Sequence, residues 1–426
     1  MNYKESLEYL QGLEFHGIKL GLQSTEMALE AFGRPQDDFK SVLVAGTNGK
    51  GSTCAFLSHI LVRNGHKTGF YSSPHLVHWN ERFAVNNKSI SNSEFAKAAT
   101  HVRKILEDQR LSLTLFEFTT VMALVWFSQK KVAFAVLEVG MGGKLDAINV
   151  VNGVVNAITH IGLDHQQYLG VGLRQIAVEK AGIIKNKAPL LSCERNPEFQ
   201  ALFRDLALAA NASPAYFLEK DFTYFKKSVS DGLETMDFKG FGLEWKDIAV
   251  SLWGDHQLEN AALALGIAAE LKQQKLCRLS EPKTRKAIET TAWPGRFQIL
   301  QHNPTVVIDA CHNPDGVRAF SAALAAAYPN RKVSLVVGIS SDKNAREMLS
   351  ELLPLGHSAI FCEARFRATP TADLAAIGKE FLPAFKIREI ADVKTAVKAA
   401  IASAKPDDLI CVCGSMFVIG EALELH

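Results

Sequence analysis

The sequence predicts an α/β fold with two domains, and three observations support this prediction. Short β-branched and apolar runs alternate with longer helical patterns, which is typical of βαβ units around a mostly parallel sheet. A Gly-rich turn joins one of these runs directly to a helical stretch. A break at Trp293–Arg296 precedes a second alternating series. We therefore expect an N-terminal domain of residues 1–295 and a smaller C-terminal domain of residues 296–426.

The individual elements follow from these patterns. The expected N-terminal strands are Ser41–Ala45, Val132–Val139, Val154–Thr159 and Ala188–Ser192. The expected helices include Lys50–Asn64, Phe116–Gln129 and Glu259–Lys272. Aromatic residues among Gly and charged residues predict a small antiparallel hairpin region at 214–252. The expected C-terminal strands, separated by Ala-rich helices, are Thr305–Ile308, Val333–Val337, Ala359–Phe361 and Leu409–Val412.

Composition excludes several classes of protein. The 426 residues correspond to two or three domains at about 150 residues each. A net charge of +2 without a strong basic patch argues against a nucleic-acid partner. The sequence contains no run of 18 apolar residues and begins with a mixed polar segment, which argues against a membrane protein. Seven scattered cysteines without a C-x-x-C pair predict free thiols. We expect a cytoplasmic monomer.

The Gly-rich turn predicts a phosphate-binding loop. The strand Ser41–Ala45 leads into Gly46-Thr47-Asn48-Gly49-Lys50-Gly51-Ser52, where a helix begins. Glycines allow backbone N–H groups to approach phosphate oxygens at a helix N-terminus, and a lysine adds a point charge. Ser52 or Thr53 is placed to contact the Mg²⁺ of a nucleotide. The loop departs from the usual phosphate-loop pattern G-x-x-x-x-G-K-[ST], because Gly51 lies between Lys50 and Ser52.

Further motifs extend over nearly the whole chain. They are Tyr71-Ser72-Ser73-Pro74-His75-Leu76, Leu137–Asp146, Gly162-Leu163-Asp164-His165, Glu179-Lys180-Ala181-Gly182, His256-Gln257 with Asn260-Ala261-Ala262, Pro294-Gly295-Arg296-Phe297, Asp309–Pro314 and Cys413-Gly414-Ser415. Together with the loop, this ordered set resembles the folylpolyglutamate synthase/dihydrofolate synthase family of the Mur-ligase superfamily. The resemblance implies a P-loop-type N-terminal ATPase domain with a mostly parallel sheet and a smaller Rossmann-like C-terminal α/β domain.

The resemblance also implies an activity. Members of the family use ATP to join L-glutamate to dihydropteroate or to reduced folates, through an acyl phosphate, with release of ADP and phosphate. We expect a bifunctional dihydrofolate synthase/folylpolyglutamate synthase. The residues leave the choice between dihydropteroate and reduced folate open.

Metal-binding and catalytic residues are implied by the same matches. Ser73, Glu138 and His165 match positions that bind Mg²⁺, although Mg²⁺ prefers oxygen ligands to imidazole. Lys180 matches a lysine that is carbamylated in the family. The expected catalytic residues are Lys50, Lys180, His165 and Arg296. His165 and Asp164 are both candidates for the base that deprotonates the incoming amine.

The remaining matches to the family are at positions that bind the nucleotide and the acceptor substrate. The expected ATP-binding residues are Thr47, Asn48, Gly49, Lys50, Gly51, Ser52, Asn260, Arg296, Asp309 and His312. The expected substrate-binding residues are Lys19, Leu20, Gly21, Leu22, Thr114, Leu115, Phe116, Glu117, Leu145, Asp146 and Ala147. The sequence departs from the family at three positions: Lys144 replaces the usual Arg, Ile148 a small polar residue, and Cys311 the usual Gly or Ala. Lysine cannot reproduce a bidentate guanidinium contact, so Lys144 bears on substrate preference.

Two alternative functions compete with this interpretation. A peptidoglycan-precursor Mur ligase shares the loop and the mechanism. It carries a separate domain for the UDP-sugar substrate, whereas about 40 residues precede this loop, by the sequence numbering. A non-catalytic ATP-binding regulatory protein needs neither Lys180 nor the acceptor-binding segments.

Overall fold

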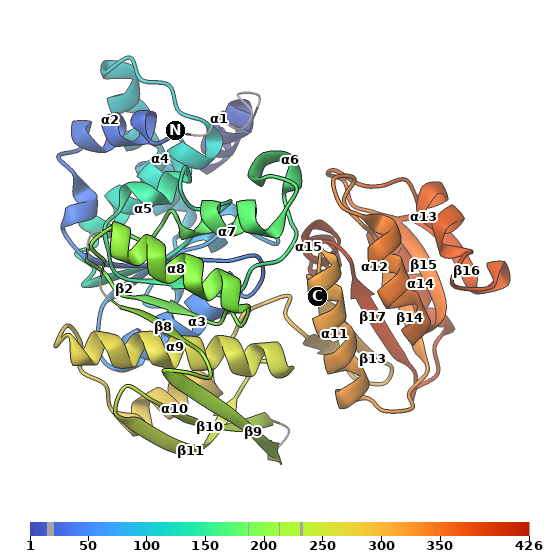
Figure 1. Ribbon diagram of the computed structural model, residues 1–426. Coiled ribbons are helices and arrows are strands. Elements are labelled where there is room, and N and C mark those ends of the chain that lie inside the picture. The colour runs from blue at the N-terminus through green and yellow to red at the C-terminus, as the bar shows by residue number, and fades with distance from the viewer. Residues whose placement is uncertain (15–20, 186, 213, 231–232, 426) are drawn as a thin grey trace. The chain divides into compact units, whose positions relative to one another are not determined.

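The computed structural model describes residues 1–14, 21–185, 187–212, 214–230 and 233–425. The chain divides into two compact units (Figure 1). The first comprises Met1–Ser251 with Leu258–Thr291, and the second comprises Leu252–Gln257 with Ala292–His426. These units follow from packing within the chain, and the domain limits 1–295 and 296–426 stay a prediction.

The first unit is built on an eight-stranded sheet. Its strand order is β4 (Lys88–Ser89), β3 (Phe83–Val85), β2 (Thr68–Tyr71), β5 (Phe134–Glu138), β1 (Lys40–Ala45), β6 (Gly153–Ile158), β7 (Leu190–Ser192) and β8 (Ala215–Phe217). β3 and β4 are antiparallel, and the strands from β2 to β8 pair in parallel. The carboxyl ends of β5, β1 and β6 therefore lie side by side, which is where open α/β sheets bind ligands.

Helices cover this sheet in the first unit. They are α1 (Tyr3–Glu14), α2 (Gln23–Ala31), α3 (Lys50–Arg63), α4 (Asn92–Asp108), α5 (Leu115–Gln129), α6 (Gln166–Leu169), α7 (Leu173–Ala181), α8 (Pro197–Ala209) and α10 (Glu281–Glu289), with short 3-10 turns at Pro35–Asp37, Trp79–Arg82 and Ala147–Val150. α5 is buried continuously from Glu117 to Phe127 because its sequence is apolar on every face. Its side chains join those of the sheet in one core.

The expected hairpin region at 214–252 is a three-stranded antiparallel sheet from Phe222 to Val250, but Ala215–Phe217 was wrongly included in it, because that segment forms β8 and pairs in parallel with β7. Its order is β11 (Leu243–Val250), β10 (Leu233–Gly240) and β9 (Phe222–Ser230). It precedes the long helix α9 (Asp255–Gln273) in the chain. Alternating burial along β11 shows that one face of this sheet is covered.

The second unit has a six-stranded sheet. Its order is β12 (Gln298–Gln301), β13 (Thr305–Asp309), β17 (Leu409–Cys413), β14 (Val333–Val337), β15 (Gly356–Glu363) and β16 (Ile387–Asp392), with only β12 antiparallel among these strands. Its helices are α11 (Pro314–Ala327), α12 (Ala345–Leu352), α13 (Thr371–Gly378), α14 (Val393–Ser403) and α15 (Met416–Leu423), with 3-10 turns at Leu353–Leu355 and Ala384–Lys386. The predicted fold class, a mostly parallel N-terminal α/β unit and a separate smaller α/β unit, is confirmed.

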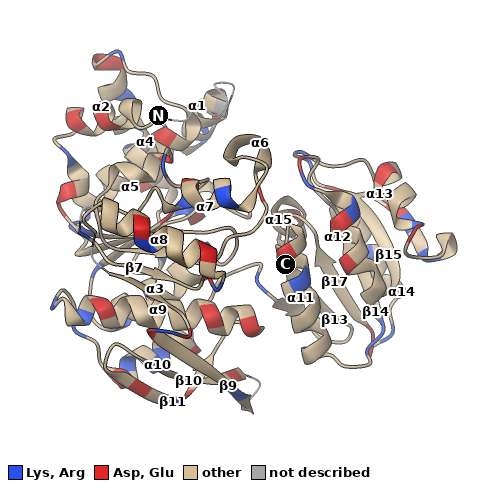
Figure 2. Ribbon diagram, viewed as in Figure 1, with Lys and Arg blue, Asp and Glu red and all other residues tan. Residues whose placement is uncertain are grey.

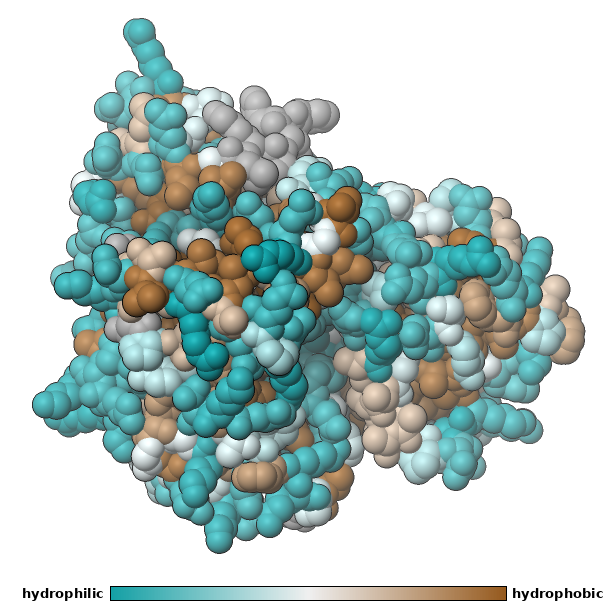
Figure 3. Space-filling view, in the orientation of Figure 1, coloured by the Kyte–Doolittle hydropathy of each residue, from teal (hydrophilic) through white to brown (hydrophobic). Residues whose placement is uncertain are grey.

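Charged residues lie on the surface of both units, and the cysteines lie in the interior. Figure 2 shows acidic and basic residues interspersed along the described elements of both units, and hydrophilic residues cover most of the face seen in Figure 3. All seven cysteines are buried free thiols. Across the described part of the chain, no helix combines the length and apolar character that crossing a membrane requires.

Candidate active site

The predicted phosphate loop connects β1 to α3, at the carboxyl end of the central strand. Gly46 has φ of +141° and Gly49 has φ of +86°, a region that favours glycine. A Cβ on Gly46 would lie 1.8 Å from Thr159 Oγ1, and one on Gly49 would lie 2.3 Å from Asn260 Oδ1. Both glycines are therefore required by backbone conformation and by close neighbours.

We expect Gly46→Ala to destabilise the protein and to impair nucleotide binding. The strained backbone alone costs about 1–3 kcal/mol, and the clash with Thr159 adds to it. Gly65→Ala is the matched control, because Gly65 has φ of +93° but nothing within 4 Å of the added Cβ. Urea unfolding of both variants separates strain from clash. Equal losses of unfolding free energy in the two variants would contradict the role of the Thr159 contact.

Lys50 opens α3 and folds back over the loop. Its Nζ donates to Gly46 O and Thr47 O, each at 3.0 Å. Ser52 and Thr53 follow in the first turn and are buried. The ammonium group therefore lies at a helix N-terminus, where it and the free backbone N–H groups can face an anion.

The segment 159–162, which follows β6, holds the loop in place. Thr159 Oγ1 donates to Asn48 O at 2.6 Å, and Thr47 N donates to His160 O at 2.9 Å. Thr47 Oγ1 and Gly162 exchange two further hydrogen bonds, of 3.0 Å and 2.9 Å. The loop conformation is thus set by a neighbouring strand end, and sequence reasoning did not assign a site role to Thr159.

Asn260 on α9 approaches the same loop. Its Oδ1 accepts from Thr53 Oγ1 at 3.4 Å, and it lies against Gly49. The residue is buried, with 6% exposure. The structure therefore brings the predicted nucleotide residue Asn260 to Thr47–Ser52, although more than two hundred residues separate them in the sequence.

Lys180 lies near the end of α7 and reaches the phosphate loop. It is 4% exposed, and its Nζ donates to Gly46 O at 2.8 Å. Burial and the nearby ammonium of Lys50 lower the pKa of Lys180 to about 7, although the carboxylates of Asp164 and Asp146 oppose this shift. A substantial fraction of this amine is therefore neutral near pH 7.

The Gly-rich segment after β5 places α7. Lys144 N donates to Glu179 O at 2.8 Å. Added Cβ atoms on Gly143 and Gly182 would lie 2.7 Å from Lys180 O and 2.4 Å from Lys144 Cα. Gly143 and Gly182 therefore allow the segment after β5 to pack closely against the end of α7, and this packing directs Lys180 to the phosphate loop.

Two of the three predicted metal-binding residues meet at strand ends. Glu138 ends β5 and is 7% exposed, and its Oε2 accepts from Ser73 N at 3.2 Å. β5 pairs with β1, which leads into the phosphate loop. The carboxylate of Glu138 suits Mg²⁺, which commonly takes one or two protein carboxylates together with the phosphate oxygens of its substrate.

His165, the third predicted metal residue, lies in an unusual backbone conformation just before α6. Its φ is +50° and its ψ is 36°, a left-handed conformation that is uncommon outside glycine. Its backbone N donates to Asp164 Oδ1 at 2.8 Å, and its Nε2 lies 3.9 Å from Asp164 Oδ2. Within the described residues no group of three or more His, Cys, Asp or Glu side chains forms a metal site.

The predicted acceptor residues form two groups in the first unit. Phe116 is half-buried on α5 and lies over Gly140, whose added Cβ would lie 2.5 Å from Phe116 Cζ and 3.2 Å from Asp146 Oδ2. Burial raises the pKa of Asp146 to about 6. The backbone N–H groups of Met141 and Ile148, which donate to its carboxylate at 2.8 Å and 3.0 Å, lower this pKa and so oppose the effect of burial. The aromatic ring of Phe116 and the carboxyl group of Asp146 therefore both lie against Gly140.

Other predicted acceptor residues have local structural partners. Thr114 and Glu117 form the capping box of α5: the Glu117 carboxylate accepts from Thr114 N and Thr114 Oγ1, both at 2.8 Å. Leu115 begins this helix, and Leu145 and Ala147 flank Asp146. Gly21 and Leu22 precede α2, whereas Lys19 and Leu20 lie outside the described residues.

The second unit carries the remaining predicted nucleotide residues. Asp309 ends β13 and is 5% exposed; its carboxylate accepts from Phe297 N and Cys311 N, both at 2.8 Å. Burial raises the pKa of Asp309, while Arg296 and the two N–H groups lower it. His312 is half-buried, and its Nδ1 lies 3.1 Å from Ala310 O. Asp309 therefore fixes the turn that carries Arg296 and the one that carries His312.

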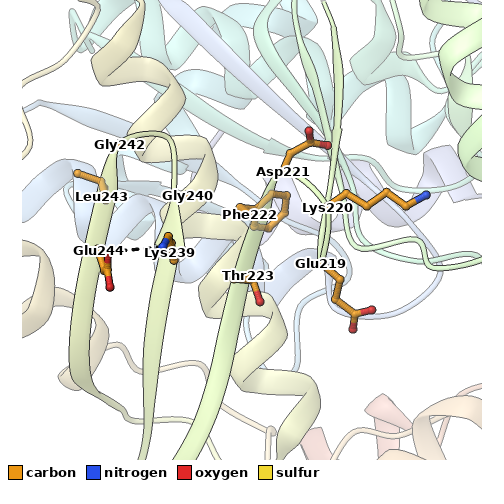
Figure 4. A pocket seen from close by; sticks show the side chains of 10 residues that line it. All are labelled: Glu219, Lys220, Asp221, Phe222, Thr223, Lys239, Gly240, Gly242, Leu243 and Glu244. Carbon is orange, nitrogen blue, oxygen red and sulfur yellow. Dashed lines mark ion pairs between the residues drawn. The ribbon is translucent and has the colours of Figure 1, made fainter.

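A hollow of about 500 Å³ lies elsewhere, at the ends of β8, β9, β10 and β11 (Figure 4). Its charged side chains have partners: Lys239 pairs with Glu244 at 3.6 Å, and Glu219 with Arg195 at 2.8 Å. None of its lining residues belongs to the predicted site. The phosphate loop, and not this hollow, is the candidate centre.

Comparison with known proteins shows which family the chain belongs to. The Mur ligase middle domain model matches residues 44–268, and the Mur ligase, glutamate ligase domain model matches residues 295–416. The chain is 31% identical over 427 residues to the Bacillus subtilis dihydrofolate synthase/folylpolyglutamate synthase, with 98% of each chain covered. It is 32% identical over 422 residues to the Escherichia coli protein of that name, with 98% of this chain and 94% of the relative covered. The chain belongs to the dihydrofolate synthase/folylpolyglutamate synthase family.

Solved structures of this family have the same fold. The Mycobacterium tuberculosis folylpolyglutamate synthase complexed with ADP and AMPPCP has a TM-score of 0.92 at 28% identity, covering 100% of this chain and 99% of that chain. The E. coli FolC structure in complex with DHPP and ADP has a TM-score of 0.86 at 31% identity, covering 100% and 97%. The family membership expected from the motifs is confirmed.

Proposed function

We propose that this member of the dihydrofolate synthase/folylpolyglutamate synthase family uses ATP to join L-glutamate to dihydropteroate or to a reduced folate, releasing ADP and phosphate. The observation that carries the proposal is the convergence of Lys50 and Lys180 on the carbonyl of Gly46, at a Gly-rich loop that opens a helix. The chain is an ATP-dependent acid–amino-acid ligase. Relatives solved with ADP, AMPPCP and DHPP support these substrates.

The proposed phosphoryl step uses charge and position more than covalent chemistry. The acceptor carboxylate attacks the γ-phosphorus of ATP, the bond to the β,γ-bridging oxygen breaks, and ADP leaves with that electron pair. Lys50 exchanges its two loop carbonyls for phosphate oxygens and neutralises their developing charge. Backbone N–H groups of Gly49–Ser52 supply oriented dipoles at the same end of α3.

The second step forms the amide. The neutral amine of glutamate attacks the carbonyl carbon of the acyl phosphate and a C–N bond forms. The C–O bond to the phosphoryl group breaks, inorganic phosphate leaves with that electron pair, and the nitrogen gives up one proton to become the amide. The proposed acceptor of the ammonium proton is either Asp164 or, when its imidazole does not hold the metal, His165; the two residues are adjacent and their side chains lie 3.9 Å apart.

Ser73, Glu138 and His165 are the proposed holders of Mg²⁺. Bound there, the cation would neutralise phosphate charge. Glu138 supplies the carboxylate from the end of β5, and the hydrogen bond from Ser73 N orients it. His165 adds an imidazole whose position is set by the left-handed backbone at φ of +50°.

Lys180 is proposed to be carbamylated. The unprotonated amine attacks CO₂, a C–N bond forms, and one proton leaves to solvent, which gives an anionic carbamate. The lowered pKa of Lys180, at about 7, supplies the unprotonated amine that this reaction needs. The change of charge places an anion in place of a cation beside Lys50 and the proposed metal site.

The remaining site residues are proposed to bind the acceptor substrate or ATP. Phe116 stacks on the pterin ring and Asp146 bonds its polar edge, with Leu145, Ala147, Gly21 and Leu22 as further contacts. Thr114, Leu115 and Glu117 hold Phe116 through the start of α5. Arg296, Asp309 and His312 are proposed to contact ATP, with Arg296 binding phosphate. Lys144 in place of the usual Arg tunes acceptor preference.

We expect glutamate-dependent ADP release from the full chain with ATP, Mg²⁺ and a pterin acceptor. Dihydropteroate and tetrahydrofolate are assayed side by side, and the acylated product is identified by mass. Omission of glutamate and omission of acceptor are the controls. Release with a UDP-muramyl acceptor but with neither pterin would favour the peptidoglycan-type ligase. No glutamate-dependent release with any acceptor would leave an ATP-binding protein without ligase activity.

A further inference from the structure

Glu194 is a buried carboxylate just after β7 that the mechanism above does not use. It is 7% exposed. Its backbone N donates to Ser192 Oγ at 3.1 Å, and its backbone O accepts from Gln200 Nε2 at 2.7 Å. The carboxylate accepts from Asn196 N through Oε1 and from Ile161 N through Oε2, both at 2.8 Å. The side chain is therefore held in one orientation by its own segment, and Oε2 reaches across to another strand end.

The bond to Ile161 falls within the segment that supports the phosphate loop. His160 O accepts from Thr47 N at 2.9 Å, and Gly162 N donates to Thr47 Oγ1 at 2.9 Å. Ile161 thus lies between two residues that contact Thr47. A group that fixes the backbone of Ile161 also fixes the two contacts on either side of it.

We propose that Glu194 is a positioning residue that sets the phosphate loop for nucleotide binding through the 159–162 segment. The proposal rests on the nucleotide-binding part of the proposed function. Glu194 acts on the loop through Ile161 and then through His160 and Gly162, which contact Thr47. The same segment leads directly to Asp164 and His165, so the bond also anchors the start of that turn.

The chemistry of the contact requires a carboxylate. Two backbone N–H groups point at two separate oxygens of Glu194. Glutamine has the same length but offers one acceptor oxygen, so its NH₂ group must face one of the two donors. A buried N–H group left without its partner is costly, and the segment is expected to shift until it is satisfied.

Glu194→Gln is expected to weaken binding of a non-hydrolysable ATP analogue by about tenfold, because one of the two buried N–H groups loses its acceptor and the 159–162 segment shifts. Glu194→Ala is expected to weaken it further. Binding is measured by calorimetry on the full chain, well below the Tm of each variant. Hydrogen exchange of the amides in 46–49 and 159–162 is measured in parallel and is expected to accelerate in Glu194→Gln.

Glu198→Gln is the matched control. It makes the same substitution four residues along the chain, on a side chain that is 59% exposed and pairs with Arg174 at 2.7 Å. Its affinity for the analogue is expected to equal that of the wild type. If Glu194→Gln lowers Tm but leaves the analogue affinity of the folded protein unchanged, the residue is purely structural and the proposal is overturned.

Two measurements keep the test independent of folding and of the ligase assignment. Rapid exchange of the Ile161 amide in the wild-type protein overturns the proposal even when the variants fail to fold. Analogue binding needs neither acceptor nor glutamate. Weakened binding in Glu194→Gln together with no ligase activity in the wild type therefore refutes the proposed reaction and supports the positioning role.

Discussion

Lys50→Ala is expected to lower kcat for glutamate-dependent ADP release by on the order of 10³-fold, the upper range for loss of one group that stabilises transition-state charge. In the resting loop the ammonium binds Gly46 O and Thr47 O. During phosphoryl transfer it would bind phosphate oxygens whose negative charge is increasing, so its loss affects the transition state more than ATP binding. kcat is expected to fall by a much larger factor than KM for ATP rises.

The fold is expected to survive this substitution. Lys50 is half-buried and contacts carbonyl groups, so its removal is expected to change unfolding free energy by about 1 kcal/mol, or roughly 2–4 °C in Tm. Lys67→Ala is the control, since Lys67 is exposed beyond the other end of α3. Steady-state kinetics and thermal unfolding of both variants are the measurements. Near-normal kcat in Lys50→Ala would refute the phosphate role.

Lys180→Met is expected to lower kcat by on the order of 10²-fold or more, because the methionine cannot form the proposed carbamate or carry its charge. The wild-type protein is expected to show a mass increase of one CO₂ under native conditions. Its activity is expected to fall in CO₂-depleted buffer and to recover when bicarbonate is added. An unmodified Lys180 together with activity that is independent of CO₂ would exclude the carbamate.

The titration of Lys180 also affects stability in CO₂-free buffer. Its pKa is about 7 in the folded protein, below the ordinary value of 10.5. Between these values the unfolded chain binds more protons than the folded protein, so the free energy of unfolding rises with pH, by up to about 1.4 kcal/mol per pH unit. Below pH 7 both states hold the proton, and the contribution no longer changes.

Urea unfolding of wild type and Lys180→Met from pH 6 to 9 tests this titration. As pH rises above about 7, the unfolding free energy of the wild type is expected to increase relative to that of Lys180→Met, because methionine does not titrate. A difference that is constant across this range would show that Lys180 keeps its ordinary pKa in the folded protein.

Local sequence patterns were sufficient to predict the α/β alternation, the buried central strands and the phosphate loop. The strands Lys40–Ala45 and Val333–Val337 are short, mostly apolar and followed directly by a glycine, so local pattern was sufficient. β2, β8 and β12 were missed because runs of three or four residues carry little periodicity. β16 was missed because its alternation of Ile, Arg and Glu is mostly exposed at a sheet edge.

The distant residues that support the loop are brought to it by the tertiary fold. Composition and spacing indicate that Gly46–Ser52 binds phosphate, because that chemistry is local to one strand–turn–helix. Thr159, Asn260 and Lys180 reach the loop through strand order and helix packing, which local sequence does not encode. The lowered pKa of Lys180 likewise arises from burial and from Lys50, and Glu194 acquires its role only because β7 lies beside β6.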